Sequence, residues 1–364
     1  MLLLGPRQTG KSTLIRNSVL PTQTINLLDN ETYLALKVNP AHLRHLLPPA
    51  GHIGTIAVDE IQRIPELLNE VHLEIEERGL KFLLTGSSAR KLRSGGINLL
   101  GGRASCRYMH PFSFIELKEQ FNLEDAITFG TLPFVFQSLQ KKQELFDYIS
   151  TYLQLEIANE GLSRSIPAFL RFLHTAALCN AQILNFTSIA SDCAVARTTM
   201  NDYFQILVDT LLCKIVEPFG STAKRKVISA PKLYFFDTGV ANAIVKRFSV
   251  AKGTREFGEC FESYFFHELN CFVDYASPQS EITYWRTKTG AEVDFILDDK
   301  IAIECKAKTK IAKDDLKGLE AFWEENKLVK LKLAYLGDVK MNFGNIEVLP
   351  WQDLIKELYL TYVL

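Results

Sequence analysis

The first residues with a spacing suited to chemistry are Gly5-Pro6-Arg7-Gln8-Thr9-Gly10-Lys11-Ser12, which satisfy the phosphate-binding pattern G-x-x-x-x-G-K-[ST]. The glycines let successive backbone N–H groups surround a phosphate, and a helix beginning at Lys11-Ser12-Thr13 adds its positive N-terminal dipole. We expect Lys11 to contact the β- and γ-phosphates and the Ser12 hydroxyl to bind Mg²⁺. The loop therefore predicts ATP and Mg²⁺ as cofactors, with a chance glycine-rich turn as the alternative.

Two acids follow an apolar strand in Ile56-Ala57-Val58-Asp59-Glu60. At the end of a strand next to the phosphate loop, Asp59 would hold Mg²⁺ through water, and Glu60 would polarise the attacking water. Two acids at a strand end are also compatible with a solvated turn. Their pairing with the upstream loop favours the catalytic interpretation and predicts an ATPase.

Two further features complete the predicted nucleotide site. Lys81–Thr85 reads as a strand that delivers Ser87 or Ser88 to the γ-phosphate, and the pattern does not choose between them. Arg103 is a candidate arginine finger, with an ordinary surface ion pair as the alternative. If a neighbouring subunit supplied this arginine, the protein would act as a homo-oligomer.

A second set of charged residues lies near the C-terminal end. Glu262 lies on a predicted helix, and a predicted hairpin carries Asp294 on one strand and Glu304 and Lys306 on the other. A three-residue turn would place Asp294 opposite Glu304, whereas a two-residue turn would pair it with Ile303. Two acids holding Mg²⁺ and a lysine that orients water are typical of a metal-dependent phosphodiesterase. A solvated outer face of the hairpin is the alternative.

The middle of the chain reads as a helix-turn-helix with a basic loop. Thr198–Leu207 is the predicted recognition helix, and Lys224-Arg225-Lys226 is the predicted wing. Lys214 to Lys232 holds five basic residues and one acid. Such a module could bind DNA phosphates, or it could pack on the ATPase as an internal lid.

The elements that position these residues follow from hydrophobic periodicity. The predicted strands are Leu2–Leu4, Gln23–Leu27, Ile53–Asp59, Lys81–Thr85, Lys232–Phe236, Ile282–Arg286, Ala291–Leu297, Ile301–Ala307 and Lys332–Leu336. The predicted helices include Lys11–Leu20, Leu67–Glu77, Phe169–Leu178, Phe261–Phe272, Asp314–Glu325 and a terminal helix. The βα alternation of the first third predicts an α/β domain with a parallel sheet. Boundaries near 155 and 250 divide the chain into residues 1–155, 156–250 and 251–364.

Composition sets outer limits on function. The 364 residues carry 41 Lys and Arg against 42 Asp and Glu, so a globally basic nucleic-acid binder is excluded. No apolar run is long enough to cross a membrane, and we expect no membrane partner. The seven cysteines form no C-x-x-C pair. Together with the absence of a secretion signal, this predicts buried, reduced thiols and a cytoplasmic protein.

A family likeness is carried by residues along most of the chain: Gly5–Ser12, Val58–Pro65, Leu84–Ala89, Gly102-Arg103, Pro111–Glu116, Pro231–Gly239, Phe261-Glu262, Trp285–Thr287, Glu292–Phe295 and Ile303–Lys306. Through them the whole chain resembles bacterial and archaeal ATPases that join an AAA-type P-loop domain to a C-terminal domain of unknown function. The resemblance implies ATP hydrolysis, a winged helix and an α/β, restriction-endonuclease-like core of the PD-(D/E)XK type. It also implies that Glu262, Asp294, Glu304 and Lys306 share the nuclease-like site. Relatives have a longer lead into the first strand, so we expect a shortened nucleotide domain here.

These observations favour an ATP-driven switch or motor that positions a DNA-binding, metal-dependent nuclease domain. One alternative is a regulatory ATPase whose C-terminal fold only binds partners. Another is a DNA-binding transcription factor with a vestigial ATPase.

Overall fold

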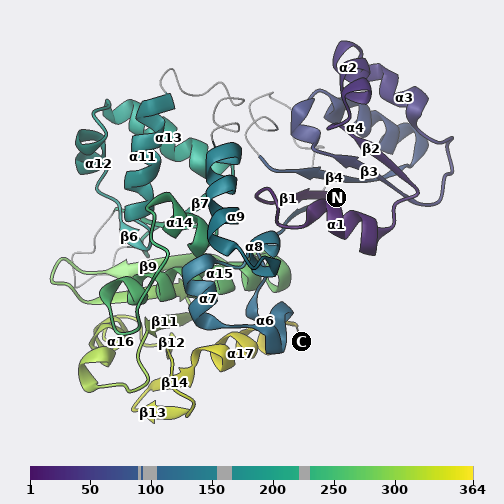
Figure 1. The fold of residues 1–364 in the computed structure, drawn as a ribbon. Coiled ribbons are helices and arrows are strands. Elements are labelled where there is room, and N and C mark those ends of the chain that lie inside the picture. Colours follow the sequence, from purple (N-terminus) through teal and green to yellow (C-terminus); the bar gives the residue numbers. More distant parts are fainter. Residues whose placement is uncertain (89–91, 93–104, 154–165, 221–229, 364) are drawn as a thin grey trace. The chain divides into compact units, whose positions relative to one another are not determined.

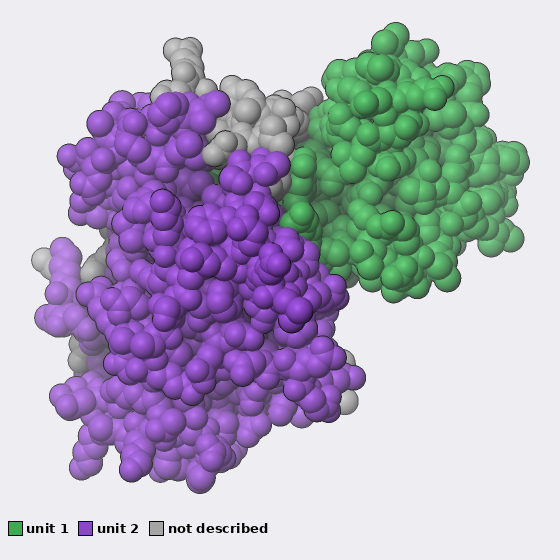
Figure 2. Space-filling model, in the orientation of Figure 1, with its two compact units in different colours: residues 1–111, 205–212 green, residues 112–204, 213–364 purple. Residues whose placement is uncertain are grey.

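The computed structural model describes residues 1–88, 92, 105–153, 166–220 and 230–363. They form two compact units, Met1–Pro111 with Gln205–Leu212, and Phe112–Phe204 with Cys213–Leu364 (Figure 2). This division differs from the boundaries expected near 155 and 250, and the three-domain division stays a prediction. The predicted finger Arg103 and the predicted wing at 224–226 lie outside the described residues.

Unit 1 is built on a five-stranded parallel sheet in the order β2-β3-β4-β1-β5 (Figure 1). Its strands are β1 (Leu2–Leu4), β2 (Gln23–Asn26), β3 (Thr55–Asp59), β4 (Lys81–Gly86) and β5 (Cys106–Tyr108). The carboxyl ends of parallel strands meet at one edge of a sheet. The phosphate loop after β1 and the acids at the end of β3 therefore lie on that edge, with β4 between them.

Helices cover both faces of this sheet because its strands are apolar on both sides. Leu2 and Leu4 pack in a core with Leu67 and Val71 of α4 (Leu67–Arg78). Leu3 points the other way and packs with Ile15. The helices α2 (Asn30–Val38) and α3 (Leu43–Leu46) contribute to the first core. The predicted helix at Lys11–Leu20 is α1 (Lys11–Leu14) continued by a π-helical turn over Ile15–Val19.

The C-terminal part of unit 2 is a mixed six-stranded sheet in the order β13-β14-β12-β11-β10-β9. Its strands are β9 (Ile282–Arg286), β10 (Glu292–Leu297), β11 (Ile301–Lys306), β12 (Lys330–Tyr335), β13 (Met341–Phe343) and β14 (Ile346–Pro350). The strands β9, β10 and β11 form an antiparallel meander, and β11, β12 and β14 run parallel. Neither the β13–β14 hairpin nor β5 was predicted from the hydrophobic pattern.

Two helical layers enclose this sheet. The long helix α15 (Arg255–Ala276) and α17 (Trp351–Val363) cover one face, where Phe265 packs against Phe295. The other face packs on α16 (Lys317–Trp323), which supplies Leu319 and Phe322. Gly318 belongs to this contact, because a Cβ there would lie 1.9 Å from the Glu292 carbonyl oxygen. Only glycine lets α16 approach β10 this closely.

The remainder of unit 2 is helical, with a small three-stranded sheet in the order β6-β8-β7. Its elements are α6 (Phe114–Leu117), α7 (Leu123–Phe129), α8 (Pro133–Gln137), α9 (Lys141–Asp147), α11 (Ile166–Leu178), β6 (Gln182–Ile183), α12 (Phe186–Asp192), α13 (Arg197–Asp209), β7 (Cys213–Val216), β8 (Lys232–Phe235) and α14 (Thr238–Ile244). Aromatic contacts join α11 to α13, with Phe172 edge-on to Phe204. The predicted recognition helix lies within α13, but the winged-helix assignment stays a prediction.

The structure bears on two predictions, that the cysteines are buried thiols and that no helix crosses a membrane. All seven cysteines are free, but Cys106 is exposed and Cys179 half-buried, so the expectation that all are buried was wrong for these two. Cys106 lies on β5, an edge strand of the sheet, and is open to solvent there. No described helix is both long and apolar enough to cross a membrane.

Candidate functional site

The phosphate loop is held in place by its own backbone. Lys11 is 5% exposed, and its Nζ donates hydrogen bonds of 2.8 Å to the carbonyl oxygens of Gly5 and Pro6. Gly10 has a φ of 98°, in the left-handed region that favours glycine, and α1 begins directly after it. A Cβ at Gly5 would lie 2.4 Å from the Met109 carbonyl oxygen, so this position also requires glycine. The lysine ammonium thus lies against the loop that is predicted to bind phosphates.

The structure also places Gln8, Thr9 and Thr13, which belong to the predicted loop. The Thr9 hydroxyl donates to the Pro6 carbonyl oxygen at 2.9 Å, and Gln8 has a φ of 63°. Thr13 is exposed on the first turn of α1. These contacts fix the curve of the loop, so its backbone N–H groups keep their directions without a ligand.

Ser12 and Asp59 come together at the expected magnesium position. The Ser12 hydroxyl donates a 2.9 Å hydrogen bond to Asp59 Oδ2, and the Thr85 hydroxyl donates to Asp59 Oδ1. A hydroxyl and a carboxylate are hard oxygen ligands of the kind Mg²⁺ prefers. Magnesium needs only one or two protein ligands when nucleotide phosphates and water complete its shell. These residues therefore fit Mg²⁺ bound together with a nucleotide.

Glu60 is part of a buried polar network that the sequence analysis did not foresee. Gln62 Nε2 donates to Glu60 Oε2 at 2.5 Å and to the Ser87 hydroxyl oxygen at 2.9 Å. Thr85 Oγ1 accepts the Glu60 backbone N–H at 3.3 Å. Gln62 follows the two acids in a short 3-10 turn over Ile61–Arg63, and it is buried there, which the sequence pattern does not reveal.

The two candidate serines have different neighbours. Ser87 joins the Glu60 network, with its hydroxyl 3.3 Å from Glu60 Oε2. The Ser88 hydroxyl instead donates to the Asp209 carbonyl oxygen at 3.4 Å. Of the two serines, Ser87 therefore joins the polar network of Glu60, and the contact of Ser88 with Asp209 lies elsewhere.

The C-terminal acids line a cavity of about 780 Å³ in unit 2. All four predicted residues of the nuclease-like site, Glu262, Asp294, Glu304 and Lys306, contribute to its wall. The other charged residues of the lining are Lys232, Arg255, Glu259, Arg286, Glu292, Asp314, Asp315 and Lys317. Residues from α15, β8, β10, β11 and the start of α16 thus converge on one pocket.

The strand register is that of a three-residue turn. Phe295 pairs with Ile303 and Leu297 with Ile301 across the hairpin, which is the register that sets Asp294 against Glu304. The register of β10 against β9 shifts between Val293 and Ile296, which marks a bulge. A bulge re-aims side chains, and here Asp294 Oδ2 accepts the Cys305 backbone N–H at 2.8 Å.

Lys232 links three of the pocket's acids. Its Nζ lies 2.8 Å from Glu262 Oε1, 2.6 Å from Glu292 Oε1 and 3.7 Å from Asp294 Oδ1, and its side chain is 3% exposed. Lys232 was predicted to belong to a basic stretch that could bind DNA phosphates. That interpretation was wrong for this residue, because β8 directs its side chain into the acidic pocket.

Burial and mutual repulsion raise the pKa values of two acids of this pocket. Burial raises the pKa of Glu262 to about 7, although Lys232 opposes the rise. Burial and the nearby Asp294 charge raise the pKa of Glu304 well above its ordinary value. Glu304 Oε1 lies 2.5 Å from the Lys306 ammonium. Glu304 Oε2 is buried without a hydrogen-bond partner, so it can accept a cation or a donor.

The fit of a metal ion to this pocket rests on few ligands. Within the described ranges, no three His, Cys, Asp or Glu side chains are grouped so that they could hold a metal ion. The orphaned Glu304 oxygen and the Asp294 carboxylate provide hard oxygen ligands of the kind that Mg²⁺ and Mn²⁺ accept. The residues therefore fit one divalent ion, with water supplying most of its coordination.

Three family models match successive parts of the chain. Residues 1–118 match a family described as an AAA domain. Residues 120–251 and 257–354 match two families described as domains of unknown function, DUF8612 and DUF4143.

Similar proteins and structures have also been found. The uncharacterized proteins Rv2008c of Mycobacterium tuberculosis and Mb2031c of Mycobacterium bovis are each 26% identical over 313 residues, covering 82% of this chain and 67% of each relative. The Aeropyrum pernix ORC1 protein in complex with DNA overlaps 67% of this chain and 86% of that one, at 11% identity and a TM-score of 0.27. Can2 from Sulfobacillus thermosulfidooxidans in complex with cyclic tetra-adenylate overlaps 100% and 99%, at 11% identity and a TM-score of 0.24. Such TM-scores establish no shared fold. The N-terminal 118 residues are thus similar to AAA domains, and their parallel sheet carries the phosphate loop after its strand β1.

Proposed function

We propose that this protein binds and hydrolyses ATP and uses the nucleotide state to control its C-terminal pocket. The observation that carries the ATPase proposal is the 2.9 Å hydrogen bond from the Ser12 hydroxyl to Asp59. It joins the phosphate loop after β1 to the acids at the end of β3, across the intervening strand β4. A loop and acids that had no shared role would not need to meet at one edge of the sheet.

Each residue of this site has a defined task in the proposal. Bound phosphates would draw the Lys11 ammonium away from the Gly5 and Pro6 carbonyl oxygens, because a charged acceptor binds it more strongly. Ser12 and Asp59 would hold Mg²⁺, which neutralises charge on the phosphates. Glu60 would orient and polarise the attacking water, while Gln62 and Ser87 keep its carboxylate in place.

The test of the ATPase proposal is Mg²⁺-dependent phosphate release by the full chain. We expect steady ATP turnover that requires Mg²⁺, and loss of both binding and turnover in Lys11→Ala. Lys37→Ala, on the exposed surface of α2, is the matched control and should retain both. Turnover that survives in Lys11→Ala would contradict the proposal.

For the C-terminal pocket we propose metal-dependent cleavage of phosphodiesters in DNA. The support is the register that sets Asp294 against Glu304, together with the buried and orphaned Glu304 oxygen. Asp294 and Glu304 would hold the metal, which activates water, and Lys306 would orient that water. Glu262 would complete the acidic wall of the pocket.

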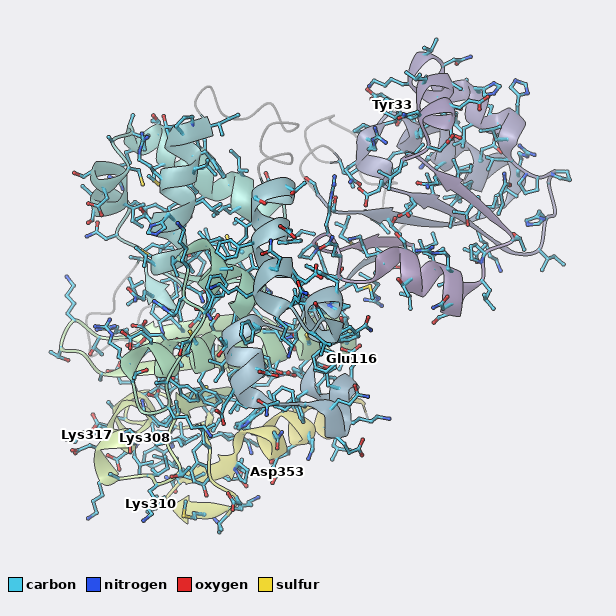
Figure 3. The ribbon with its side chains drawn as sticks, viewed as in Figure 1. Tyr33, Glu116, Lys308, Lys310, Lys317 and Asp353 are labelled. Atoms are coloured by element: carbon cyan, nitrogen blue, oxygen red, sulfur yellow. The ribbon has the colours of Figure 1, made fainter. Side chains whose placement is uncertain are left out.

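A basic segment borders this pocket and suits a polyanionic substrate. Residues 306–317 contain five lysines and two aspartates, and Lys317 lines the cavity. Figure 3 labels Lys308 and Lys310, which lie between β11 and α16, and Lys317, the first residue of α16. By contrast, the exposed residues of α13 include Arg197 and Asp202, whose charges cancel. The basic segment is therefore the better candidate for contact with DNA phosphates.

Cleavage of plasmid and linear DNA with Mg²⁺ or Mn²⁺, with and without ATP, tests this second proposal. We expect nicking or cutting that disappears in Asp294→Asn and in Glu304→Gln. Intact DNA after prolonged incubation would favour the alternative function, a nucleotide-dependent regulator whose C-terminal pocket only binds a partner. The ion pairs that already occupy most of the acids in the pocket favour that alternative.

A further inference from the structure

The buried lysine of the C-terminal pocket has no role in the proposed cleavage. Lys232 is the first residue of β8, the middle strand of the small sheet, and it is 2% exposed. It is delivered to the pocket by a different sheet from the one that carries Asp294, Glu292 and Glu304. Burying a lysine is costly unless its charge is paired, so its position needs an explanation.

The contacts of Lys232 occupy one side of the pocket. Its ammonium lies within 2.8 Å of oxygens of both Glu262 and Glu292, and 3.7 Å from Asp294 Oδ1. Tyr234, two residues further along β8, donates its hydroxyl to Glu262 Oε1 at 2.6 Å. Arg286 pairs with the other oxygen of Glu292 at 2.9 Å. On this side, Glu262 and Glu292 thus already have positive or hydrogen-bonding partners.

The opposite side of the pocket is different. Glu304 is paired through Oε1 with Lys306, and its Oε2 is buried without a partner. Asp294 lies between the two sides, with Oδ1 toward Lys232 and Oδ2 on the Cys305 amide. On the Glu304 side, an entering cation would meet a carboxylate oxygen that has no hydrogen-bond partner.

We propose that the Lys232 ammonium is the resident counter-ion of Glu262 and Glu292, and that it keeps divalent metal away from these two acids. Metal then enters the pocket only on the Glu304 side, as a single ion. Lys232 is a positioning residue in this scheme, because it acts on the metal through the carboxylates. The inference rests on the proposed metal use of the pocket, and it adds the limit to one ion.

Manganese binding to the full chain without nucleotide tests this inference. Isothermal titration with MnCl₂ should find at most one ion bound per wild-type chain. In Lys232→Met, Glu262 and Glu292 lose this counter-ion, so we expect either a second ion or at least tenfold tighter binding. A folded Lys232→Met protein with the wild-type stoichiometry and affinity would overturn the proposal.

The chain offers a closely matched control. Lys332 on β12 is also a buried lysine between two acids, Glu347 and Glu357, but it does not line the pocket. Lys332→Met should therefore leave manganese binding unchanged, although it too removes a buried charge. An equal gain in both variants would mean that manganese responds to any unpaired buried acids, and it would count against a specific role of Lys232.

A second variant keeps the inference testable if Lys232→Met alone does not fold. Lys232→Met with Glu292→Gln removes one negative charge together with the positive one, so fewer acids are left without a partner. Manganese should raise the Tm of either variant by more than it raises the Tm of the wild type. An equal or smaller rise would contradict the proposal. Because this readout needs no DNA, a failure of the nuclease proposal would appear separately, as intact DNA with an unchanged difference in manganese binding.

Discussion

The acids of the two sites have different kinds of partners, neutral groups in unit 1 and cations in unit 2. In unit 1, Asp59 and Glu60 are held by neutral partners, the hydroxyls of Ser12 and Thr85 and the amide of Gln62. In unit 2, Glu262, Glu292 and Glu304 are paired with Lys232, Arg286 and Lys306. The first site keeps its negative charge available for an incoming cation, whereas the second has largely neutralised its own.

This difference has a consequence for ligand binding. Neutral donors orient a carboxylate without cancelling its charge, so Mg²⁺ with a nucleotide can be attracted to it. A carboxylate in a close ion pair must first give up its partner, which reduces the net gain from binding a metal. We therefore expect strong metal dependence in the nucleotide site and weaker metal binding in the C-terminal pocket.

The largest effect is expected from Glu60→Gln in the nucleotide site. The amide keeps the shape of the side chain but cannot polarise water, so ATP turnover should fall about 100- to 1,000-fold. ATP affinity should change little, because Glu60 is not predicted to contact the phosphates. Phosphate release and nucleotide titration measure the two quantities, and Glu66→Gln, at an exposed acid, serves as control. A variant with normal turnover would assign the task to another residue.

A smaller effect is expected from Gln62→Ala, which removes the bridge between Glu60 and Ser87. The carboxylate stays in the site but loses the donor that fixes its direction, so turnover should fall roughly tenfold. ATP affinity should be unchanged. Gln23→Ala, which removes only an exposed side-chain hydrogen bond, is the control. Equal loss of affinity and turnover would instead indicate a general disturbance of the loop.

Much of the nucleotide site could be predicted because its residues are close in sequence to the strands that carry them. The loop directly follows β1 and the acids end β3, so an apolar strand and a local motif were enough. The choice between Ser87 and Ser88 needed the fold. It depends on which hydroxyl meets Gln62, and strand periodicity beyond the end of β4 does not determine that direction.

The C-terminal pocket was predicted less completely. Its acids were recognised on the helix and the hairpin, but Lys232 lies 30 residues before Glu262 and beside basic residues that indicated a surface loop. Its burial depends on the packing of two separate sheets, which no local pattern records. The β10 bulge, which re-aims Asp294, is likewise invisible in an apolar–polar pattern of six residues. The hairpin of β13 and β14 was missed because β13, unlike the buried β1, is short and mostly exposed and so forms no apolar run.

The last prediction compares two acids of the same helix, Glu262 and Glu268. Glu268 lies on α15 as Glu262 does, but it accepts hydrogen bonds from neutral donors, the Tyr264 hydroxyl and the Phe114 amide. Burial raises the pKa of Glu268 to about 8. The folded protein therefore keeps a proton that the unfolded chain releases near its ordinary pKa of 4.5. Stability from this group is complete below pH 4.5 and falls as the pH rises toward 8.

Glu268→Gln removes that dependence, because an amide does not titrate. Between pH 5 and pH 8, the free energy of unfolding of the wild type should fall by roughly 3 kcal/mol more than that of the variant. Urea unfolding at several pH values measures the difference, with Glu256→Gln, at an exposed acid on the same helix, as control. Other titrating groups of the pocket are present in both proteins and cancel in the comparison. Parallel pH profiles would mean that Glu268 ionises as easily in the folded protein as in the unfolded chain. Neutral donors would then suffice to stabilise a buried carboxylate in either unit, and the cations of the C-terminal pocket would be needed for its ligand rather than for its fold.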